Sequence, residues 1–362
     1  MPIAAIPLQH WFSEKTNLEV PEEMKSPFLS ICIATYNRAD FIGETLDSIV
    51  RQLTDEVEIV VVDGASTDAT RTVVEHYAAG CPGLRYVRLP EKGGVDQDFC
   101  KAVEYARGEY CWLFPDDDLL KPGAVNRVLG ELQNGHSLLI VNADVMDRDF
   151  STVLQPAIFD NREDETYGPD ELEGLFMRIV PNISFIGCVV IRRETWLERE
   201  HSRYFGTEFI HVGVIFQGPL PASAFVIAQP YISIRYGNAQ WTSRFFEIWM
   251  LKWPRIIWSL DRISVDAKRK RGVKPEPWRR LKALRGCRAS GAYSRDMYEK
   301  IIANSNASRP WKLAALAISL LPLPAFNSCM LWYLKTFKKH KIMKIYDLSI
   351  GRENMPGNPL RK

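Results

Sequence analysis

Residues 28–141 alternate short apolar runs with amphipathic helical stretches, and this alternation constrains the fold more than any other feature of the sequence. The runs at residues 28–35 and 58–62 are rich in β-branched residues, which is typical of buried strands. Between the runs, apolar residues recur at helical spacing, as they do over residues 99–106. Strands and helices in strict alternation, joined by short connections, predict an α/β fold with a mostly parallel sheet flanked by helices.

The same patterns predict the boundaries of the elements. The predicted strands are residues 28–35, 58–62, 84–89, 110–114 and 138–141, followed by 184–191 and 225–234. The predicted helices start at an N-cap Asp40, near Thr67, before residue 99, at Pro122 and within residues 205–217. Residues 150–167 are predicted to form a loop. Ligands of such sheets bind beyond the carboxyl ends of the strands, where Thr35, Asp63 and residues 116–118 fall.

Charge divides the chain into two parts. From Arg235 onward the chain holds 27 Lys and Arg against 8 Asp and Glu, whereas the preceding 234 residues hold 19 against 36. We therefore predict an N-terminal arm at residues 1–25, an acidic α/β domain at 26–240, and a basic, Trp-rich helical extension at 241–362. A basic extension suits an anionic partner such as a membrane surface. No nucleic-acid motif accompanies it, so nucleic acid is not an expected partner.

Three consecutive aspartates, Asp116, Asp117 and Asp118, follow the predicted strand at residues 110–114 and are the strongest chemical signal. Adjacent carboxylates at a strand end repel one another and need a compensating cation. A hard divalent ion, Mn²⁺ or Mg²⁺, takes oxygen ligands and retains positions for substrate phosphates. The alternative explanation is a solvated acidic turn that caps the following helix.

Further motifs accompany the aspartates in a fixed order. They are Ile33-Ala-Thr-Tyr-Asn-Arg38, Val61-Val-Asp-Gly-Ala-Ser-Thr-Asp68, Gly93-Gly94 and Ala106-Arg-Gly-Glu-Tyr110. In order and spacing, residues 26–145 resemble the family 2 glycosyltransferases, whose fold is of the GT-A type. The basic remainder is similar in style to abequosyltransferase-like members, which build bacterial surface polysaccharides. The resemblance implies a metal-assisted, inverting transfer of a hexosyl or deoxyhexosyl group from a nucleotide diphosphate to a glycan.

Carried onto this sequence, the resemblance implies roles for the motif residues. The nucleotide-sugar site would be formed by Thr35, Tyr36, Arg38, Asp63, Lys92, Gly93, Gly94, Asp96, Asp116 and Asp117, with Asp63 reading the base. Asp118 would be the first metal ligand and Asp116 the second. Structural explanations remain open, because Thr35 and Tyr36 also suit the capping and packing of the first helix and Asp63-Gly64 alone is a common turn.

Two positions depart from the family pattern. Pro115 stands where many relatives carry an acid, so the resemblance does not fix the division of labour among the three aspartates. Residues 95–100 (VDQDFC) replace an Ala-Arg-Asn sequence of many relatives. The donor contacts of that segment are therefore left open by the resemblance.

An inverting transfer needs a general base, because an acceptor hydroxyl is a poor nucleophile. In the family this base is an acid in a later motif, and residues 206–212 (GTEFIHV) are the segment in the corresponding place. Glu208 is the candidate base. His211 is the alternative base, or a phosphate or metal contact, because residues three apart share a face of a helix. The structural explanation is a surface acid beside a packed histidine.

Apolar residues 313–321 and 325–334 are interrupted by prolines and followed by a run of lysines. This pattern favours an interfacial helix or hairpin on anionic lipid over a transmembrane helix, and a helical packing subdomain with a basic face is the alternative. A lipid-linked glycan acceptor would make such docking useful. Seven scattered cysteines without a Cys-x-x-Cys pair indicate reduced thiols, so we expect a cytoplasmic protein, peripheral on the inner face of the cell membrane.

Three other classes of protein fit the sequence less well. A sugar nucleotidyltransferase requires a Gly-rich, basic loop directly after the first strand, where residues 34–38 are Ala-Thr-Tyr-Asn-Arg. A dinucleotide oxidoreductase requires Gly-x-Gly-x-x-Gly in the same turn. A non-catalytic, membrane-associated glycan-binding scaffold of the same fold has no need of intact aspartates. The nucleotidyltransferase and the scaffold are kept as alternatives to a glycosyltransferase.

Overall fold

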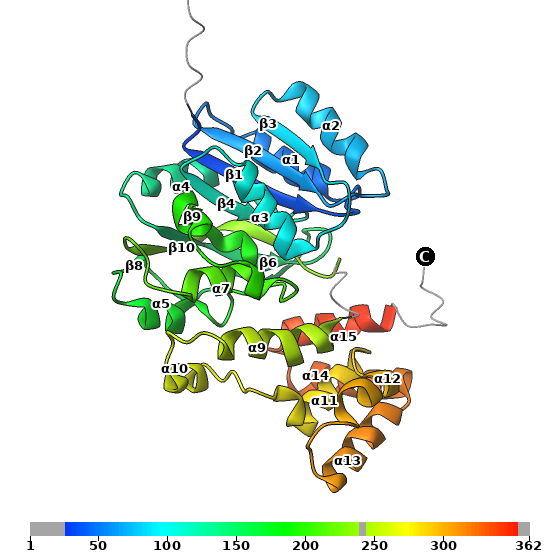
Figure 1. Cartoon of the computed structure of the whole chain (residues 1–362). Helices are drawn as coiled ribbons and strands as arrows, with labels where there is room; N and C mark the ends of the chain where they lie inside the picture. Colours follow the sequence, from blue (N-terminus) through cyan, green and yellow to red (C-terminus); the bar gives the residue numbers. More distant parts are fainter. Residues whose placement is uncertain (1–25, 239–243, 354–362) are drawn as a thin grey trace, which may run out of the picture.

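The computed structural model describes residues 26–238 and 244–353, which form a twisted sheet flanked by helices and a helical part below it (Figure 1). Within the described residues the sheet has ten strands, and its main path runs β3-β2-β1-β4-β9-β6-β10-β5. The strands are β1 (Leu29–Thr35), β2 (Val57–Asp63), β3 (Leu84–Arg88), β4 (Tyr110–Phe114), β5 (Leu119–Leu120), β6 (Leu138–Met146), β7 (Val153–Gln155), β8 (Glu165–Tyr167), β9 (Val189–Arg192) and β10 (Ala224–Arg235).

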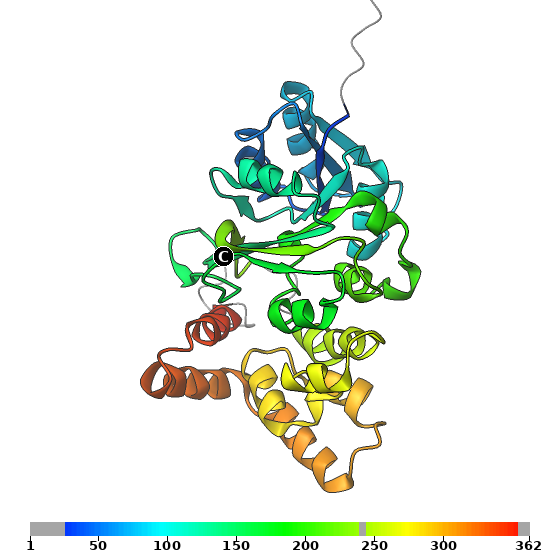
Figure 2. The ribbon, with the colours of Figure 1, turned by 90° about the vertical axis from the view of Figure 1, so that its left-hand side faces the viewer.

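The first half of the sheet is parallel and covered on both faces. β1 pairs in parallel with β2 and β4, and β2 pairs in parallel with β3. Nearly every residue of β1, β2 and β4 is buried, because α1 (Ile42–Val50), α2 (Thr70–Gly80) and α4 (Ala124–Leu132) cover one face and α3 (Val95–Tyr105) covers the other (Figure 2). The carboxyl ends of these strands meet at one edge, as the sequence predicts.

The second half of the sheet is mixed. β9 runs antiparallel between β4 and β6, and β6 pairs in parallel with β10. The short strands β5, β7 and β8 add antiparallel pairings. Three further helices beside this half are α5 (Leu172–Ile179), α6 (Arg193–Leu197) and α7 (Ile210–Phe216). The predicted α/β class with helices on both faces is confirmed, and its parallel part consists of β1 to β4 together with the β6–β10 pair.

Some predicted boundaries differ from the structure. Asp40 is not the N-cap of α1: the cap residue is Phe41, and the Arg38 carbonyl accepts from the backbone of both Phe41 and Ile42, so a turn starts this helix. α2 begins at Thr70, later than predicted, because Asp68 bonds the Thr70 N–H.

Segments after β6 differ more, because their apolar patterns are short. Residues 150–167, predicted to be a loop, contain β7 and β8. Within residues 184–191 a 3-10 turn at Ile186–Cys188 precedes β9. Of residues 205–217, α7 alone is α-helical. Short irregular segments of this kind carry too little periodicity to fix their boundaries.

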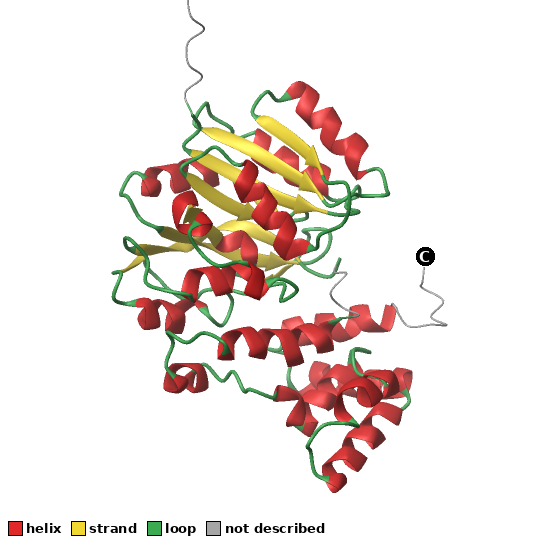
Figure 3. Ribbon diagram, viewed as in Figure 1, coloured by secondary structure: helices red, strands yellow, loops and turns green. Residues whose placement is uncertain are grey.

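The basic part of the chain is helical (Figure 3). It also has a hydrophobic core of its own. A π-helical turn at Ile248–Lys252 continues α8 into α9, and the Phe209 ring centroid lies 4.9 Å from that of Trp253, which joins this part to the sheet domain. The predicted domain borders stay predictions, because the arm at residues 1–25 and residue 240 lie outside the described residues. The helices are α8 (Phe245–Glu247), α9 (Trp253–Trp258), α10 (Val265–Lys270), α11 (Leu281–Ala289), α12 (Arg295–Met297), α13 (Arg309–Leu320), α14 (Leu323–Phe337) and α15 (Ile342–Glu353).

The pair α13–α14 contains the apolar segments that the sequence singles out. No single helix in the described part of the chain is long and apolar enough to cross a membrane, whereas α13 and α14 reach that length and composition only together and are bent by 94°. Four large apolar side chains on them are more than half exposed, with values of 56–66%. They are Leu313, Leu320, Trp332 and Phe337.

Candidate active site

A cavity of about 1530 Å³ lies at the carboxyl edge of the sheet, bounded by the ends of β1 and β10, by the loop after β4, and by α11, α14 and α15 of the helical part. The predicted site residues that line it are Thr35, Tyr36, Arg38, Lys92, Gly93, Gly94, Asp96, Asp116, Asp117, Asp118 and Glu208. Asp63 and His211 are not among the lining residues. The fold therefore gathers most of the predicted donor residues and the candidate base around one space.

The three aspartates form a floor of negative charge. Arg38 places Nε 3.3 Å from Asp116 Oδ1 and Nη2 3.4 Å from Asp117 Oδ2. Burial, and next the charge of Asp117, raise the pKa of Asp116 to about 7, although Arg38 lowers it. The same two causes raise the pKa of Asp118 well above its ordinary value. Like charges buried side by side are costly, so this floor is short of positive charge.

Arg235, at the end of β10, holds the aspartate loop in place. Its backbone N–H donates to Asp118 Oδ1 at 2.7 Å, and its Nε donates to the Asp117 carbonyl oxygen at 2.9 Å. The guanidinium pairs with Glu44 and lies 4.3 Å from the ring centroid of Phe150. The motifs do not indicate Arg235. The one signal in the sequence is a charged residue that closes a long apolar strand.

The predicted nucleotide residues after β1 and before α3 face each other across the cavity. Lys92 Nζ lies 3.6 Å from the ring centroid of Tyr36, so a cation covers one face of this ring. Gly94 has φ +103°, a conformation that side chains with a Cβ rarely adopt, and it allows the backbone to turn into α3. Thr35 ends β1 and is almost fully buried.

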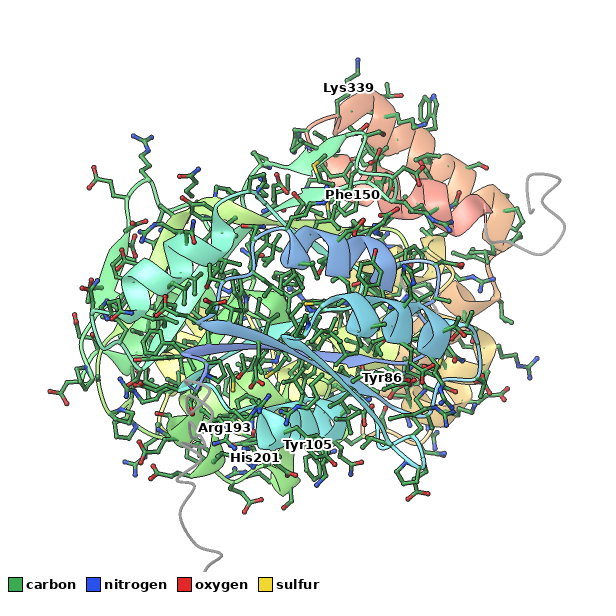
Figure 4. The ribbon with its side chains drawn as sticks, turned by 90° about the horizontal axis from the view of Figure 1, so that it is seen from above. Tyr86, Tyr105, Phe150, Arg193, His201 and Lys339 are labelled. Atoms are coloured by element: carbon green, nitrogen blue, oxygen red, sulfur yellow. The ribbon has the colours of Figure 1, made fainter. Side chains whose placement is uncertain are left out.

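Asp63, the predicted reader of the base, ends β2 but has no exposed surface. Its Oδ1 accepts from the Ser66 N–H at 2.7 Å, and its Oδ2 accepts from the Tyr86 hydroxyl at 2.6 Å. Tyr86 belongs to the edge strand β3 (Figure 4). Both carboxylate oxygens are therefore bonded inside the domain. Base recognition by Asp63 stays a prediction, and this placement favours a structural role.

Asp96 fixes the backbone around Glu208. Its Oδ2 accepts from the Glu208 N–H at 2.9 Å, and its Oδ1 accepts from the Ile210 N–H at 3.2 Å. Burial raises the pKa of Asp96 to about 6, although these two backbone donors lower it. Glu208 itself has φ +68°, which is strained for a residue with a Cβ. Strain of this kind persists only where the surrounding structure enforces it, as Asp96 does here.

The Glu208 carboxylate points toward cations of the helical part. Oε1 lies 2.9 Å from Lys252 Nζ and pairs with Arg244. Glu247 shares both cations, at 3.2 Å from Arg244 and 3.1 Å from Lys252. Because Glu208 lines the cavity and Glu247 does not, the two acids offer a matched pair for experiment.

His211 lies inside α7 and is fully buried. Its Nε2 lies 2.6 Å from the Ile183 carbonyl oxygen, and burial lowers its pKa to about 4, so the imidazole is neutral at pH 7. Glu208 precedes α7 in a left-handed conformation, so the helical spacing that places the two residues on one face does not apply. A catalytic role for His211 stays a prediction that this placement does not favour.

The last helix packs against the segment that follows β10. Tyr236 donates from its hydroxyl to Asp347 Oδ1 at 2.6 Å, and Asn238 Nδ2 donates to Asp117 Oδ2 at 2.8 Å. Between them, Gly237 has φ +105°, and a Cβ there would collide with side chains of α15. The segment therefore connects α15 directly to the aspartate loop.

The described residues contain no group of three or more His, Cys, Asp or Glu side chains arranged to hold a metal ion by themselves. All seven cysteines are free thiols, and six of them are buried, so none is paired in a disulfide.

A solved structure with this fold is that of residues 1–349 of TarS from S. aureus in complex with UDP. It covers 90% of this chain and 90% of the TarS chain, with a TM-score of 0.52 and 18% sequence identity. The same TarS fragment in another crystal structure gives a TM-score of 0.50 at 17% identity. At these identities the similarity establishes a shared fold.

Curated relatives match part of the chain. Abequosyltransferase RfbV of Salmonella typhimurium is 26% identical over 205 residues, which are 52% of this chain and 60% of RfbV. The putative teichuronic acid biosynthesis glycosyltransferase TuaG of Bacillus subtilis is 28% identical over 130 residues, which are 34% of this chain and 52% of TuaG. The matched region thus spans less than two thirds of each of these relatives.

Residues 30–199 match the model of the family described as glycosyl transferase family 2. The match includes the parallel strands β1 to β4, the Gly93-Gly94 turn and the aspartate loop, which supply most of the cavity floor. Family match, relatives and fold agree with the resemblance seen in the sequence. Over residues 30–199, somewhat less than half of its length, the chain is therefore similar to glycosyl transferase family 2.

Proposed function

We propose that this protein is a glycosyltransferase that moves a sugar from a nucleoside diphosphate to a glycan. The observation that carries the proposal is the single cavity in which Tyr36, the aspartate loop and Glu208 meet. The first two suit a nucleotide and its phosphates, and the third suits a proton acceptor for the incoming hydroxyl. The names of the relatives, and the UDP bound to TarS, agree with a nucleotide-sugar donor.

A divalent ion, Mn²⁺ or Mg²⁺, fits the aspartate loop. Carboxylate oxygens are the ligands that these ions prefer, and Arg38 alone does not balance three aspartates. Asp118 and Asp116 would hold the ion. When bound, it would neutralise the charge that develops on the departing diphosphate.

The proposed transfer is inverting, with Glu208 as the base. The carboxylate takes the proton of the acceptor hydroxyl, the acceptor oxygen bonds to the anomeric carbon, and the bond from that carbon to the diphosphate oxygen breaks. Asp96 positions Glu208 through its backbone, while Lys252 and Arg244 hold its carboxylate. A fixed base is effective because proton transfer requires hydrogen-bond contact with the hydroxyl.

We further propose that the acceptor is a polysaccharide or O-antigen type glycan linked to lipid and reached at the inner face of the cell membrane. The exposed apolar side chains of Trp332 and Phe337, on α14, lie in the same segment as a run of lysines, all of them exposed, and Lys339 projects away from the body of the molecule (Figure 4). Apolar groups next to lysines suit an anionic lipid surface. The lysines are Lys335, Lys338, Lys339, Lys341 and Lys344.

The test is donor binding and Mn²⁺-dependent turnover of a panel of nucleotide sugars by the wild type, Asp118→Ala and Glu208→Ala. Asp118→Ala is expected to lose donor binding, whereas Glu208→Ala is expected to bind the donor and to stop transfer. Unchanged binding by Asp118→Ala would remove the metal assignment. If the wild type binds a nucleotide sugar but does not turn it over, the non-catalytic scaffold is favoured. If it instead releases pyrophosphate from a nucleoside triphosphate and a sugar phosphate, the sugar nucleotidyltransferase is favoured.

A further inference from the structure

Asp98 is a buried carboxyl group in the cavity wall that the proposed reaction does not use. It lies in the first turn of α3, lines the cavity and is only 3% exposed. Its Oδ1 is buried and has no hydrogen-bond partner. A buried polar oxygen without a partner costs free energy, so a carboxylate is retained here at a cost to the folded state. A ligand that donates a hydrogen bond would remove this cost.

Two glycines of the sequence motifs make room for this carboxyl group. A Cβ at Gly64 would lie 2.7 Å from Asp98 Oδ2, and a Cβ at Gly93 would lie 3.1 Å from Oδ1. Both distances are shorter than ordinary contacts, so any larger residue would displace Asp98. The glycines after β2 and before α3 therefore leave room for Asp98 in the wall of the cavity, which Tyr36 and Lys92 also line.

Asp98 differs from Asp63 in having a carboxylate oxygen that no group of the protein bonds. Asp63 has no exposed surface, and both of its oxygens are bonded to Ser66 and Tyr86. Asp98 lines the cavity, and its buried Oδ1 has no hydrogen-bond partner inside the protein. Burial raises the pKa of Asp98 to about 6, while the charge of Lys92 lowers it, so the group is mostly ionised at neutral pH and accepts hydrogen bonds.

We propose that Asp98 recognises the nucleobase of the donor by accepting a hydrogen bond from a ring N–H, and that the donor therefore carries uracil, thymine or guanine rather than cytosine. The inference rests on the proposed function. The base would stack on the Tyr36 ring, in the place that Lys92 Nζ takes in this structure. Uracil and thymine present N3–H and guanine presents N1–H, whereas N3 of cytosine is a lone pair that repels a carboxylate.

The experiment is isothermal titration of UDP, GDP and CDP, each with Mn²⁺, against the full chain and its Asp98→Asn variant. An asparagine has nearly the shape of aspartate, and its amide can donate to cytosine N3 as well as accept from an N–H. For the wild type we expect UDP or GDP to bind at least about tenfold more tightly than CDP, because a hydrogen bond to a charged group has this magnitude. In Asp98→Asn we expect this preference to shrink to within about threefold.

Glu104→Gln is the matched control, because Glu104 is a half-exposed acid on the same helix that pairs with Lys101. Gly64→Ala is the second variant: it keeps the carboxylate but displaces it, and the preference should shrink there too, even if Asp98→Asn does not fold. A preference unchanged in both variants, or CDP as the best ligand of the wild type, overturns the role of Asp98 and leaves the proposed function standing. If no nucleoside diphosphate binds the wild type, both proposals fall.

Discussion

The sheet edge and the helical wall bound the same cavity but hold their charges differently. At the sheet edge, Asp96, Asp116 and Asp118 are each less than a tenth exposed, and their partners are fixed groups of the protein. On the helical wall, Lys338 and Lys341 are exposed. Buried charges with fixed partners give a rigid site, whereas exposed lysines retain their freedom and adapt to a ligand. Under the proposed function, the sheet edge would be a preorganised donor end of the cavity and the helical wall an adaptable acceptor end.

The largest effect should come from the acid at which the two regions meet. Glu208→Gln is expected to lower kcat by about 10²–10⁴-fold, because a neutral amide cannot take a proton, and to change donor affinity by less than about twofold. Steady-state kinetics and titration calorimetry measure the two quantities. Glu247→Gln, which removes the other acid held by Arg244 and Lys252, should change kcat by less than about twofold. An equal loss of kcat in both variants would show that turnover depends on the pairing of Arg244 and Lys252 and not on a base at Glu208.

Rigidity of the donor end is tested by Arg235→Lys. A lysine keeps the charge but cannot bond the Asp117 carbonyl and Glu44 together, so we expect kcat/KM to fall about tenfold and the free energy of unfolding to fall by about 1–3 kcal/mol. Arg178→Lys is the control, because it disturbs a comparable ion pair, with Glu165. It should lower the free energy of unfolding and leave kcat/KM unchanged. A donor affinity and kcat/KM that stay unchanged in Arg235→Lys would mean that the aspartate loop does not depend on this clamp.

A smaller effect is expected on the pH dependence of stability. Burial raises the pKa of Asp96 from an ordinary value of 3.8 to about 6, so between these pH values the folded protein binds a proton that the unfolded chain has lost. Stability from this group is therefore present at low pH and is lost as pH rises toward 6. We therefore compare the drop in Tm from pH 5 to pH 7 in the two proteins. This drop should be smaller in Asp96→Asn than in the wild type, by roughly 2–4 °C. Parallel Tm profiles would contradict this assignment.

The smallest effect on catalysis is expected at the helical wall. Replacing Lys335 and Lys339 together by Gln, two exposed lysines beside this wall that do not line the cavity, should change kcat on a soluble acceptor by less than about twofold. Binding to vesicles that contain phosphatidylglycerol should fall more than tenfold, because each lysine near an anionic surface contributes about 1 kcal/mol. Lys270→Gln with Lys300→Gln, whose side chains pair with acids of their own helices, serves as the control in vesicle sedimentation. Equal vesicle binding by all variants would make this wall a packing surface only.

The sequence predicts the parallel half of the sheet well, because each of its strands and helices has its own periodic pattern. It does not predict that β9 enters antiparallel between β4 and β6, because that pairing joins residues far apart in the chain. Residues of the first half that end or follow strands, such as Thr35 and Asp116, are brought to the cavity as predicted, since the edge of a parallel sheet gathers them.

The rest of the candidate site depends on packing that no local pattern encodes. Asp63 accepts a hydrogen bond from Tyr86 of the neighbouring strand and does not line the cavity, whereas Asp98 does. Arg235 bonds Asp118, which lies 117 positions earlier in the chain. Glu208 and His211 do not share a helix face as predicted. Glu208 has a left-handed backbone conformation and precedes α7, whereas His211 lies within it.

The bond from Tyr236 to Asp347 has a consequence for how this protein is made. A ribosome adds roughly 5–20 residues per second, and the N-terminal part of a chain folds first. All strands of the described sheet have been synthesised once residue 235 is added, yet the partner of Tyr236 follows 111 residues later. The nascent chain thus carries its sheet before α15 can dock, and the wall that α15 supplies to the cavity is the last to be put in place.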